Sequence, residues 1–174
     1  MRPLADPDLP VVLGWGRSCQ ALCGLHQRFQ LDHLQRLLDS YRQNGLVTRT
    51  AGVLLIEEIE GNAAVGIVQY SFIDTPDEDL SHPEIGFAIL EPAARGRGYA
   101  TEAVRLLVDY LFAGYPSERI TAFTDVENAA SQRVLARVGF EREGVMRRAS
   151  FRGGTFRDIA LYGLLRGAPR AARG

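Results

Sequence analysis

A short stretch rich in glycine and arginine has the composition of an anion-binding loop. Residues 95–100 read Arg-Gly-Arg-Gly-Tyr-Ala and stand between a strand-like run at 84–90 and an amphipathic helix pattern at 101–113. The first backbone N–H groups of a helix have no partner inside it, and the helix dipole adds partial positive charge there. The position of this stretch therefore predicts a phosphate site at a helix N-terminus.

In this stretch the glycines would contribute backbone conformation and the arginines would contribute charge. Gly96 and Gly98 permit positive φ and a close backbone approach, and Arg95 and Arg97 add formal charge beside an anion. The spacing differs from two common phosphate loops, because no Gly-Lys-Ser/Thr ending is present and Thr101 stands where a dinucleotide fingerprint has its third glycine. The alternative is an ordinary glycine-rich loop that caps a helix.

Arg95, Gly98 and Ala100 fit the pattern Arg/Gln-x-x-Gly-x-Gly/Ala, which resembles the pyrophosphate-binding motif of the GNAT superfamily of N-acetyltransferases. The resemblance is to its ribosomal-protein acetyltransferase branch, the RimJ/RimL type. Three further segments resemble parts of that branch in the right order: its first strand and helix at 2–15, its fourth strand at 84–90 and its second acetyl-CoA motif at 128–144.

This resemblance covers residues 2–165 and implies the GNAT fold, an α/β (α+β) architecture whose mixed central sheet has about seven strands and about four flanking helices. The order strand, helix, strand, helix in the middle of the chain independently predicts a parallel pair, and hairpin signals at 60–62 and 152–154 predict antiparallel pairs. In the family the parallel pair splays to admit the pantetheine arm. Here those strands would start at Glu84 and Ile120.

Hydrophobic periodicity sets the expected elements. We expect one GNAT acetyltransferase domain over residues 1–166 and a disordered tail at 167–174. Helices are expected over 6–23, 31–44, 101–113 and 128–137, and strands over 48–58, 63–73, 84–90, 120–124, 145–151 and 155–165.

The resemblance also implies how acetyl-CoA is held. The N–H groups of the loop would bind the pyrophosphate, and the backbone of the strand at 84–90 would pair with pantetheine. A bulge in that strand would free one N–H group to face the thioester oxygen. Asn128 would form a hydrogen bond with the pantetheine arm. The alternative for Asn128 is a helix N-cap, which is the commoner role of an asparagine at such a position, and both roles can coexist. The implied cofactor-binding residues are Phe87, Ala88, Ile89, Arg95, Gly96, Arg97, Gly98, Tyr99, Ala100, Asn128 and Ser131.

The catalytic positions depart in part from the family pattern. Many members carry a tyrosine acid seven residues after the asparagine, where this chain has Leu135. The RimJ/RimL branch has a serine three residues after it, matched by Ser131, whose hydroxyl would lie near the leaving sulfur; the alternative is a second helix-capping hydroxyl. Some branch members place a glutamate before the final hairpin turn, and Ser150 stands at that position here.

Glu84 is the preferred general base, because it opens the strand that would splay. The alternative is a surface charge at a strand end, and His82 is a weaker candidate. An α-amine of pKa about 7.7–8.0 is neutral at pH 7 far more often than a lysine-like amine near 10.4, so a weak base favours the former. The acidic segment 74–79 favours a cationic acceptor, although such segments are usually only solvated.

Composition limits the other classes of function. With 174 residues, 46% hydrophobic content and a formal charge of −1, the chain can bury one core and has no overall basic character for nucleic acid or acidic membranes. No apolar run suits a membrane span or a secretion signal, so we expect a cytoplasmic protein. Cys19, Cys23 and His26 invite a metal hypothesis, but no fourth ligand follows and small core cysteines are the preferred interpretation.

The leading hypothesis is an N-acetyltransferase that moves an acetyl group from acetyl-CoA, without a metal, to a primary amine of a small molecule or a peptide N-terminus. A rival keeps the fold but uses a longer acyl-CoA, an acyl carrier or an aminoacyl-tRNA as donor. The third hypothesis is a non-catalytic CoA-binding module, which would predict a degraded phosphate loop. No nucleic acid partner is expected unless the donor is aminoacyl-tRNA, no membrane partner is expected, and the chain would be a monomer or homodimer.

Overall fold

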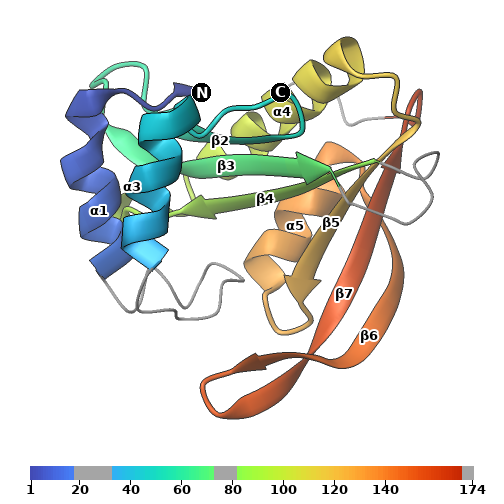
Figure 1. Cartoon of the computed structure of the whole chain (residues 1–174). Helices are drawn as coiled ribbons and strands as arrows, with labels where there is room; N and C mark the ends of the chain where they lie inside the picture. The colour runs from blue at the N-terminus through green and yellow to red at the C-terminus, as the bar shows by residue number, and fades with distance from the viewer. Residues whose placement is uncertain (18–32, 73–81, 170–174) are drawn as a thin grey trace. The chain divides into compact units, whose positions relative to one another are not determined.

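The computed structural model describes residues 1–17, 33–72 and 82–169 (Figure 1). Two 3₁₀ turns, at Asp6–Asp8 and Pro92–Ala94, join the regular elements. The helices and strands, in chain order, are β1 (Arg2–Pro3), α1 (Leu9–Arg17), α3 (His33–Asn44), β2 (Ala51–Glu57), β3 (Ala64–Phe72), β4 (Pro83–Ile89), α4 (Tyr99–Gly114), β5 (Arg119–Asp125), α5 (Ala129–Val138), β6 (Glu141–Arg152) and β7 (Thr155–Leu165).

The strands form a seven-stranded sheet in the order β1-β2-β3-β4-β5-β7-β6. β4 pairs with β5 in parallel, with Glu84 opposite Thr121 and Ile85 opposite Ala122. β5 pairs with β7, and β7 with β6, in antiparallel fashion. The sheet is therefore mixed, and the expected parallel pair between the strands at Glu84 and Ile120 is confirmed.

The described chain forms two compact units, one of Met1–Tyr70 with Phe87–Tyr99 and one of Ser71–Gly86 with Ala100–Gly174. The helices α1 and α3 belong to the first unit and lie side by side (Figure 1). Its core packs side chains from both helices against β2 and the end of β4. The buried members are Leu4, Trp15, Leu55 and Leu90, with Val12, Tyr41, Leu46 and Val53 packed against them.

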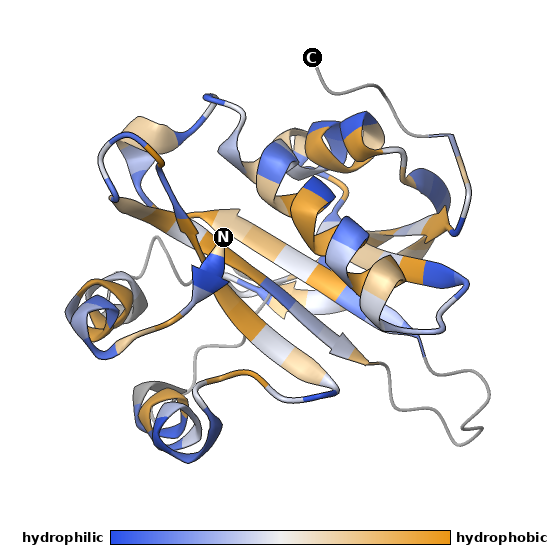
Figure 2. Ribbon diagram, turned by 90° about the horizontal axis from the view of Figure 1, so that it is seen from above, coloured by the Kyte–Doolittle hydropathy of each residue, from blue (hydrophilic) through white to orange (hydrophobic). Residues whose placement is uncertain are grey.

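The second unit is organised around α4, whose apolar side chains recur along one face of the helix. Strand β5 is buried at five of its seven positions, including consecutive ones, so both of its faces are covered, as expected for a strand inside the sheet. In Figure 2 the hydrophobic colour is concentrated on the strands, whereas the helices show both hydrophobic and hydrophilic colours. The buried residues of α4 are Ala103, Val104, Leu107, Val108 and Leu111.

β6 and β7 form a hairpin that continues past the end of β5 (Figure 1). Gly153 and Gly154 turn the chain with φ of 55° and 80°. The register shifts twice, once between Arg142 and Gly144 and once between Met146 and Ser150. These irregularities interrupt β6, which is an edge strand of the sheet, and such bulges oppose edge-to-edge pairing with another chain.

Most element boundaries agree with those expected from the sequence to within a few residues. The first helix is a 3₁₀ turn followed by α1, and the rest of the 6–23 interval lies outside the described residues. β6 begins at Glu141 rather than at residue 145, because Glu141 pairs with Gly163 of β7. None of the helices that the structure describes is long and apolar enough to cross a membrane.

Candidate functional site

The glycine-rich loop leads directly into α4, as its sequence predicted. Gly96 and Gly98 have φ of 78° and 92°, the left-handed region that side chains disfavour. Apart from the chain neighbours, an added Cβ at either glycine would meet no atom within 4 Å in the part of the chain that the structure describes. The glycines are therefore explained by backbone conformation. α4 begins directly after them at Tyr99, and the first N–H groups of a helix have no partner inside that helix.

Both arginines of the loop have partners within the first unit. Arg95 Nε donates to the carbonyl of Ile89 at 3.2 Å, which links the loop to the last residue of β4. Arg97 Nη2 donates to Glu58 Oε1 at 2.8 Å. The charge that Arg97 was expected to offer an anion is thus already opposed by a carboxylate.

Glu58 also accepts a hydrogen bond from the hydroxyl of Tyr99, on the same oxygen. This bond and the nearby Arg97 lower the pKa of Glu58, and the bond to the carboxylate raises the pKa of Tyr99. The Arg97 guanidinium lies 5.1 Å from the centroid of the Tyr99 ring. Sequence reasoning missed Glu58, because it lies 41 residues from Tyr99 in the chain and carries no local motif.

The strand segment expected to pair with pantetheine ends in a local irregularity. The N–H groups of Leu90 and Glu91 both donate to the carbonyl of Val65, at 2.9 and 3.1 Å. Two successive residues of one strand that oppose a single residue of its neighbour form a β-bulge. Gly66 follows Val65 on β3, and a Cβ there would lie 2.2 Å from the Ala88 carbonyl oxygen, so only glycine permits this close approach.

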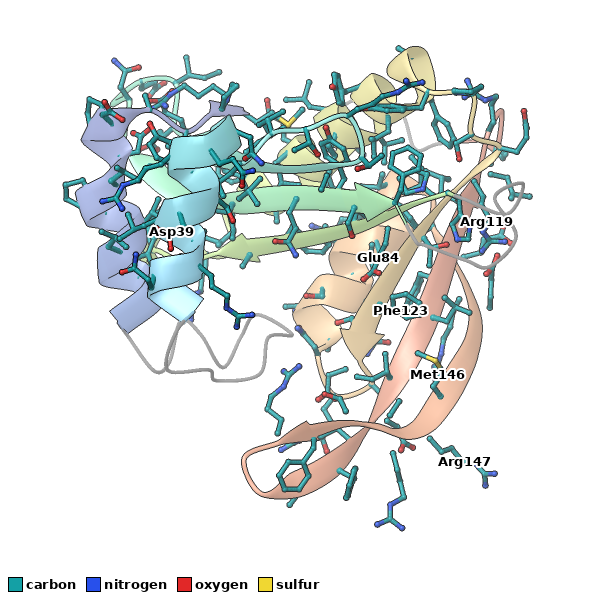
Figure 3. The ribbon with its side chains drawn as sticks, in the orientation of Figure 1. Asp39, Glu84, Arg119, Phe123, Met146 and Arg147 are labelled. Carbon is teal, nitrogen blue, oxygen red and sulfur yellow. The ribbon has the colours of Figure 1, made fainter. Side chains whose placement is uncertain are left out.

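Glu84, in the second unit, is half-buried on β4. Burial raises its pKa above the ordinary value of 4.5, and His82 partly opposes that shift. Figure 3 labels Glu84 on β4 and Phe123 on the neighbouring β5. A desolvated carboxyl with a raised pKa holds a proton more readily than a surface glutamate, which favours the base hypothesis over the surface-charge hypothesis.

Asn128 caps α5, since its Oδ1 accepts a hydrogen bond from the N–H of Ser131 at 3.1 Å. The N-cap alternative for Asn128 is therefore confirmed. The Ser131 hydroxyl has no hydrogen-bond partner among the described residues, so it is not a capping hydroxyl there. Leu135, at the position of the family tyrosine, is buried at 1% exposure in the core.

The structure divides the expected site residues between the two units. The first unit contains Phe87 to Ile89 and Arg95 to Tyr99, and the second contains Glu84, Ala100, Asn128 and Ser131. Within the second unit Asn128 and Ser131 are in direct contact, whereas no hydrogen bond among the described residues joins either of them to Glu84.

A metal site finds no support in the part of the chain that the structure describes. No group of three or more histidine, cysteine, aspartate or glutamate side chains there is arranged to hold an ion. Cys19, Cys23 and His26 lie outside the described residues.

Several known proteins are similar to this chain in sequence or in structure. The probable N-acetyltransferase YjcK of Bacillus subtilis is 40% identical over 81 residues, 47% of this chain and 44% of its own length. The structure of spermidine N-acetyltransferase from Vibrio cholerae, in complex with CoA and spermine, superimposes with a TM-score of 0.77 at 19% identity over 94% of this chain and 93% of the other. The structure of ribosomal-protein-S5-alanine acetyltransferase from Vibrio fischeri superimposes with a TM-score of 0.74 at 21% identity, over 94% of this chain and 91% of the other.

At these identities the structural neighbours show the fold, and that fold is the GNAT architecture expected from the sequence. The chain spans about half the length of the curated relatives it matches. The family model for the acetyltransferase (GNAT) domain matches residues 1–141, well over half of the 174 residues. The chain therefore belongs to the acetyltransferase (GNAT) domain family.

Proposed function

We propose that this protein is an N-acetyltransferase that transfers an acetyl group from acetyl-CoA to a primary amine of a small molecule or of a peptide or protein N-terminus. The observation that carries the proposal is the loop with Gly96 and Gly98 at positive φ immediately before α4. An intact phosphate loop of this kind argues against a non-catalytic relic of the fold.

The pyrophosphate of the donor would be held chiefly by backbone groups. The N–H groups of Arg97, Gly98, Tyr99 and Ala100 precede or open α4, where the helix dipole favours an anion. Arg95 and Arg97 are already engaged with protein acceptors, so their contribution would be to the shape of the loop more than to free charge. The backbone of Phe87 to Ile89 would pair with pantetheine, as the family resemblance implies.

The acetyl group would move by direct attack in a ternary complex. The amine nitrogen attacks the thioester carbon, the C–S bond breaks, the amine loses a proton and the departing thiolate gains one. Glu84 is the proposed acceptor of the amine proton, supported by its burial and raised pKa. The Ser131 hydroxyl, which has no other partner among the described residues, would donate a hydrogen bond to the leaving sulfur.

The acceptor class rests on the chemistry of the base. A single carboxylate whose pKa is only raised by burial is a weak base, so an amine that is partly neutral at pH 7 suits it best. Two structural neighbours are named for spermidine and for an alanine of ribosomal protein S5. The primary amines of spermidine are almost wholly protonated at pH 7, so that name fits only the broader class of primary amines, whereas an α-amine of alanine would also be partly neutral.

Titration calorimetry with acetyl-CoA, followed by a thiol-release assay on a panel of amines, tests the proposal. The panel should contain peptides with free and with blocked N-termini, a polyamine and free lysine. We expect acetyl-CoA to bind and CoA to be released only with free primary amines. Release with a longer acyl-CoA but not with acetyl-CoA would support the rival donor, and absence of any CoA binding would refute both proposals.

A further inference from the structure

One carboxylate oxygen holds the residues on both sides of Gly98. Glu58 Oε1 accepts from Arg97 Nη2 at 2.8 Å and from the Tyr99 hydroxyl. Arg97 also lies over the Tyr99 ring, with 5.1 Å from guanidinium carbon to ring centroid. These three side chains form a linked cluster in the first unit, which we name the Glu58 cluster.

The loop needs such a support because of its glycines. Gly96 and Gly98 adopt φ of 78° and 92°, and apart from its chain neighbours no atom of the described residues lies within 4 Å of a Cβ built at either position. Glycine loses more conformational freedom than any other residue when it is ordered, so packing at these two positions does little to fix the loop. Links from Arg97 and Tyr99 to a fixed point would restrict the loop on each side of Gly98.

Glu58 is suited to be that fixed point. It directly follows β2, and its N–H donates to the Ala63 carbonyl at 2.9 Å, in the hairpin that joins β2 to β3. Its side chain is 23% exposed, compared with 56% for Arg97. The carboxylate is therefore anchored to the sheet, and the more exposed loop residue is anchored to the carboxylate.

The charges in the cluster argue for a positioning role over an electrostatic one. A lone carboxylate beside a pyrophosphate would repel it, but the cation of Arg97 opposes the charge of Glu58. We therefore propose that Glu58 is a positioning residue, which holds the loop in the shape that binds the pyrophosphate of acetyl-CoA. This role rests on the proposed function, because acetyl-CoA is the ligand that the loop is proposed to bind. The geometric support for it is the Glu58 cluster.

Three variants separate position from charge. Glu58→Ala removes both the charge and the hydrogen-bond acceptor, and Glu58→Gln removes the charge but keeps an acceptor oxygen. Glu60→Ala is the matched control, since Glu60 is exposed and its charge acts on Tyr99 without bonding to it. We expect the Kd and the KM for acetyl-CoA to rise about tenfold in Glu58→Ala and about threefold in Glu58→Gln, with kcat at saturation unchanged. Glu60→Ala should bind as the wild type does or slightly more tightly.

Amide hydrogen exchange of residues 97–100 supplies a readout that needs no ligand. We expect faster exchange there in Glu58→Ala and wild-type exchange in Glu60→Ala. Equal or tighter acetyl-CoA binding by Glu58→Ala, or wild-type exchange in that variant, would overturn the inference. If the wild type itself binds no acetyl-CoA, the proposed function fails, and the exchange comparison alone then supports or overturns the role of Glu58 in holding the loop.

Discussion

The close approach of β3 and β4 at Gly66 gives a prediction whose size follows from the geometry. A Cβ built on Gly66 lies 2.2 Å from the carbonyl oxygen of Ala88 and 3.0 Å from Cα of Ile89. Both contacts are to backbone atoms, so no side chain can rotate away to relieve them. Restoring an ordinary contact distance requires the strands to separate by about 1 Å.

Gly66→Ala should therefore destabilise the protein towards the upper end of the overpacking range, by about 3 kcal/mol. In a protein of this size such a loss lowers the Tm by about 6–12 °C. The displaced backbone of Ala88 and Ile89 is also the segment proposed to pair with pantetheine. The KM for acetyl-CoA should consequently rise in the fraction that remains folded, as steady-state kinetics below the transition would show.

Gly14→Ala is the matched control for the same chemical change in the same unit. Gly14 lies within α1, and outside the surrounding helix backbone a Cβ there meets no atom of the described residues within 4 Å. This variant should stabilise the protein by about 0.5–1 kcal/mol, because alanine restricts the unfolded chain and favours a helix. Calorimetric melting of both variants should give shifts of opposite sign. A Gly66→Ala protein whose Tm is within 1 °C of the wild type would refute the close approach.

Two further predictions concern the proposed catalytic residues. Burial raises the pKa of Glu84, so its ionised form is disfavoured in the folded state; the associated stability is present below about pH 4.5 and is lost as pH rises through the folded pKa. Glu84→Gln should accordingly raise the Tm at pH 7, and this gain in Tm should vanish near pH 4. The same variant should lower kcat by about 10²–10⁴ at neutral pH, with partial recovery at high pH. A fall in kcat of less than threefold would contradict the role of Glu84 as the base. Ser131→Ala should lower kcat while the affinity for acetyl-CoA stays nearly unchanged. Its Tm should also stay nearly unchanged, because Asn128 supplies the cap of α5. Asn128→Ala is the control, and it should lower the free energy of unfolding by about 0.5–2 kcal/mol. Full turnover by Ser131→Ala would contradict its catalytic role.

The parts of the site that the sequence predicted are those encoded by neighbouring residues. The positive φ of the two glycines before α4 and the Asn128 cap each depend on residues within one helical turn, so the local sequence was sufficient to predict them. Glu58 and Gly66 could not be found in this way. Their roles depend on which strand lies beside the loop and beside β4, and those pairings join residues that are far apart in the chain.

The same distinction explains why the sequence predicted a start for β6 that is four residues too late. Glu141 to Glu143 are charged and show no alternation of apolar and polar residues, so no strand was expected before residue 145. Pairing with β7 nevertheless brings Glu141 opposite Gly163, and Glu143 forms an ion pair with Arg119 at 2.5 Å. An edge strand exposes one side to solvent and can carry charges that a central strand could not.

The loop at Gly98 is proposed to bind acetyl-CoA, and calorimetry on a matched pair of variants tests this binding most directly. Gly98→Asp adds a negative charge beside the proposed pyrophosphate, at a φ of 92° and with open space around the new Cβ. Gly45→Asp adds the same group at a φ of 65°, also in open space, at the end of α3 and away from the loop sequence. The wild type and Gly45→Asp should bind acetyl-CoA with similar Kd, and folded Gly98→Asp should show no binding. Unchanged affinity in folded Gly98→Asp would show that the donor binds elsewhere and would contradict this account.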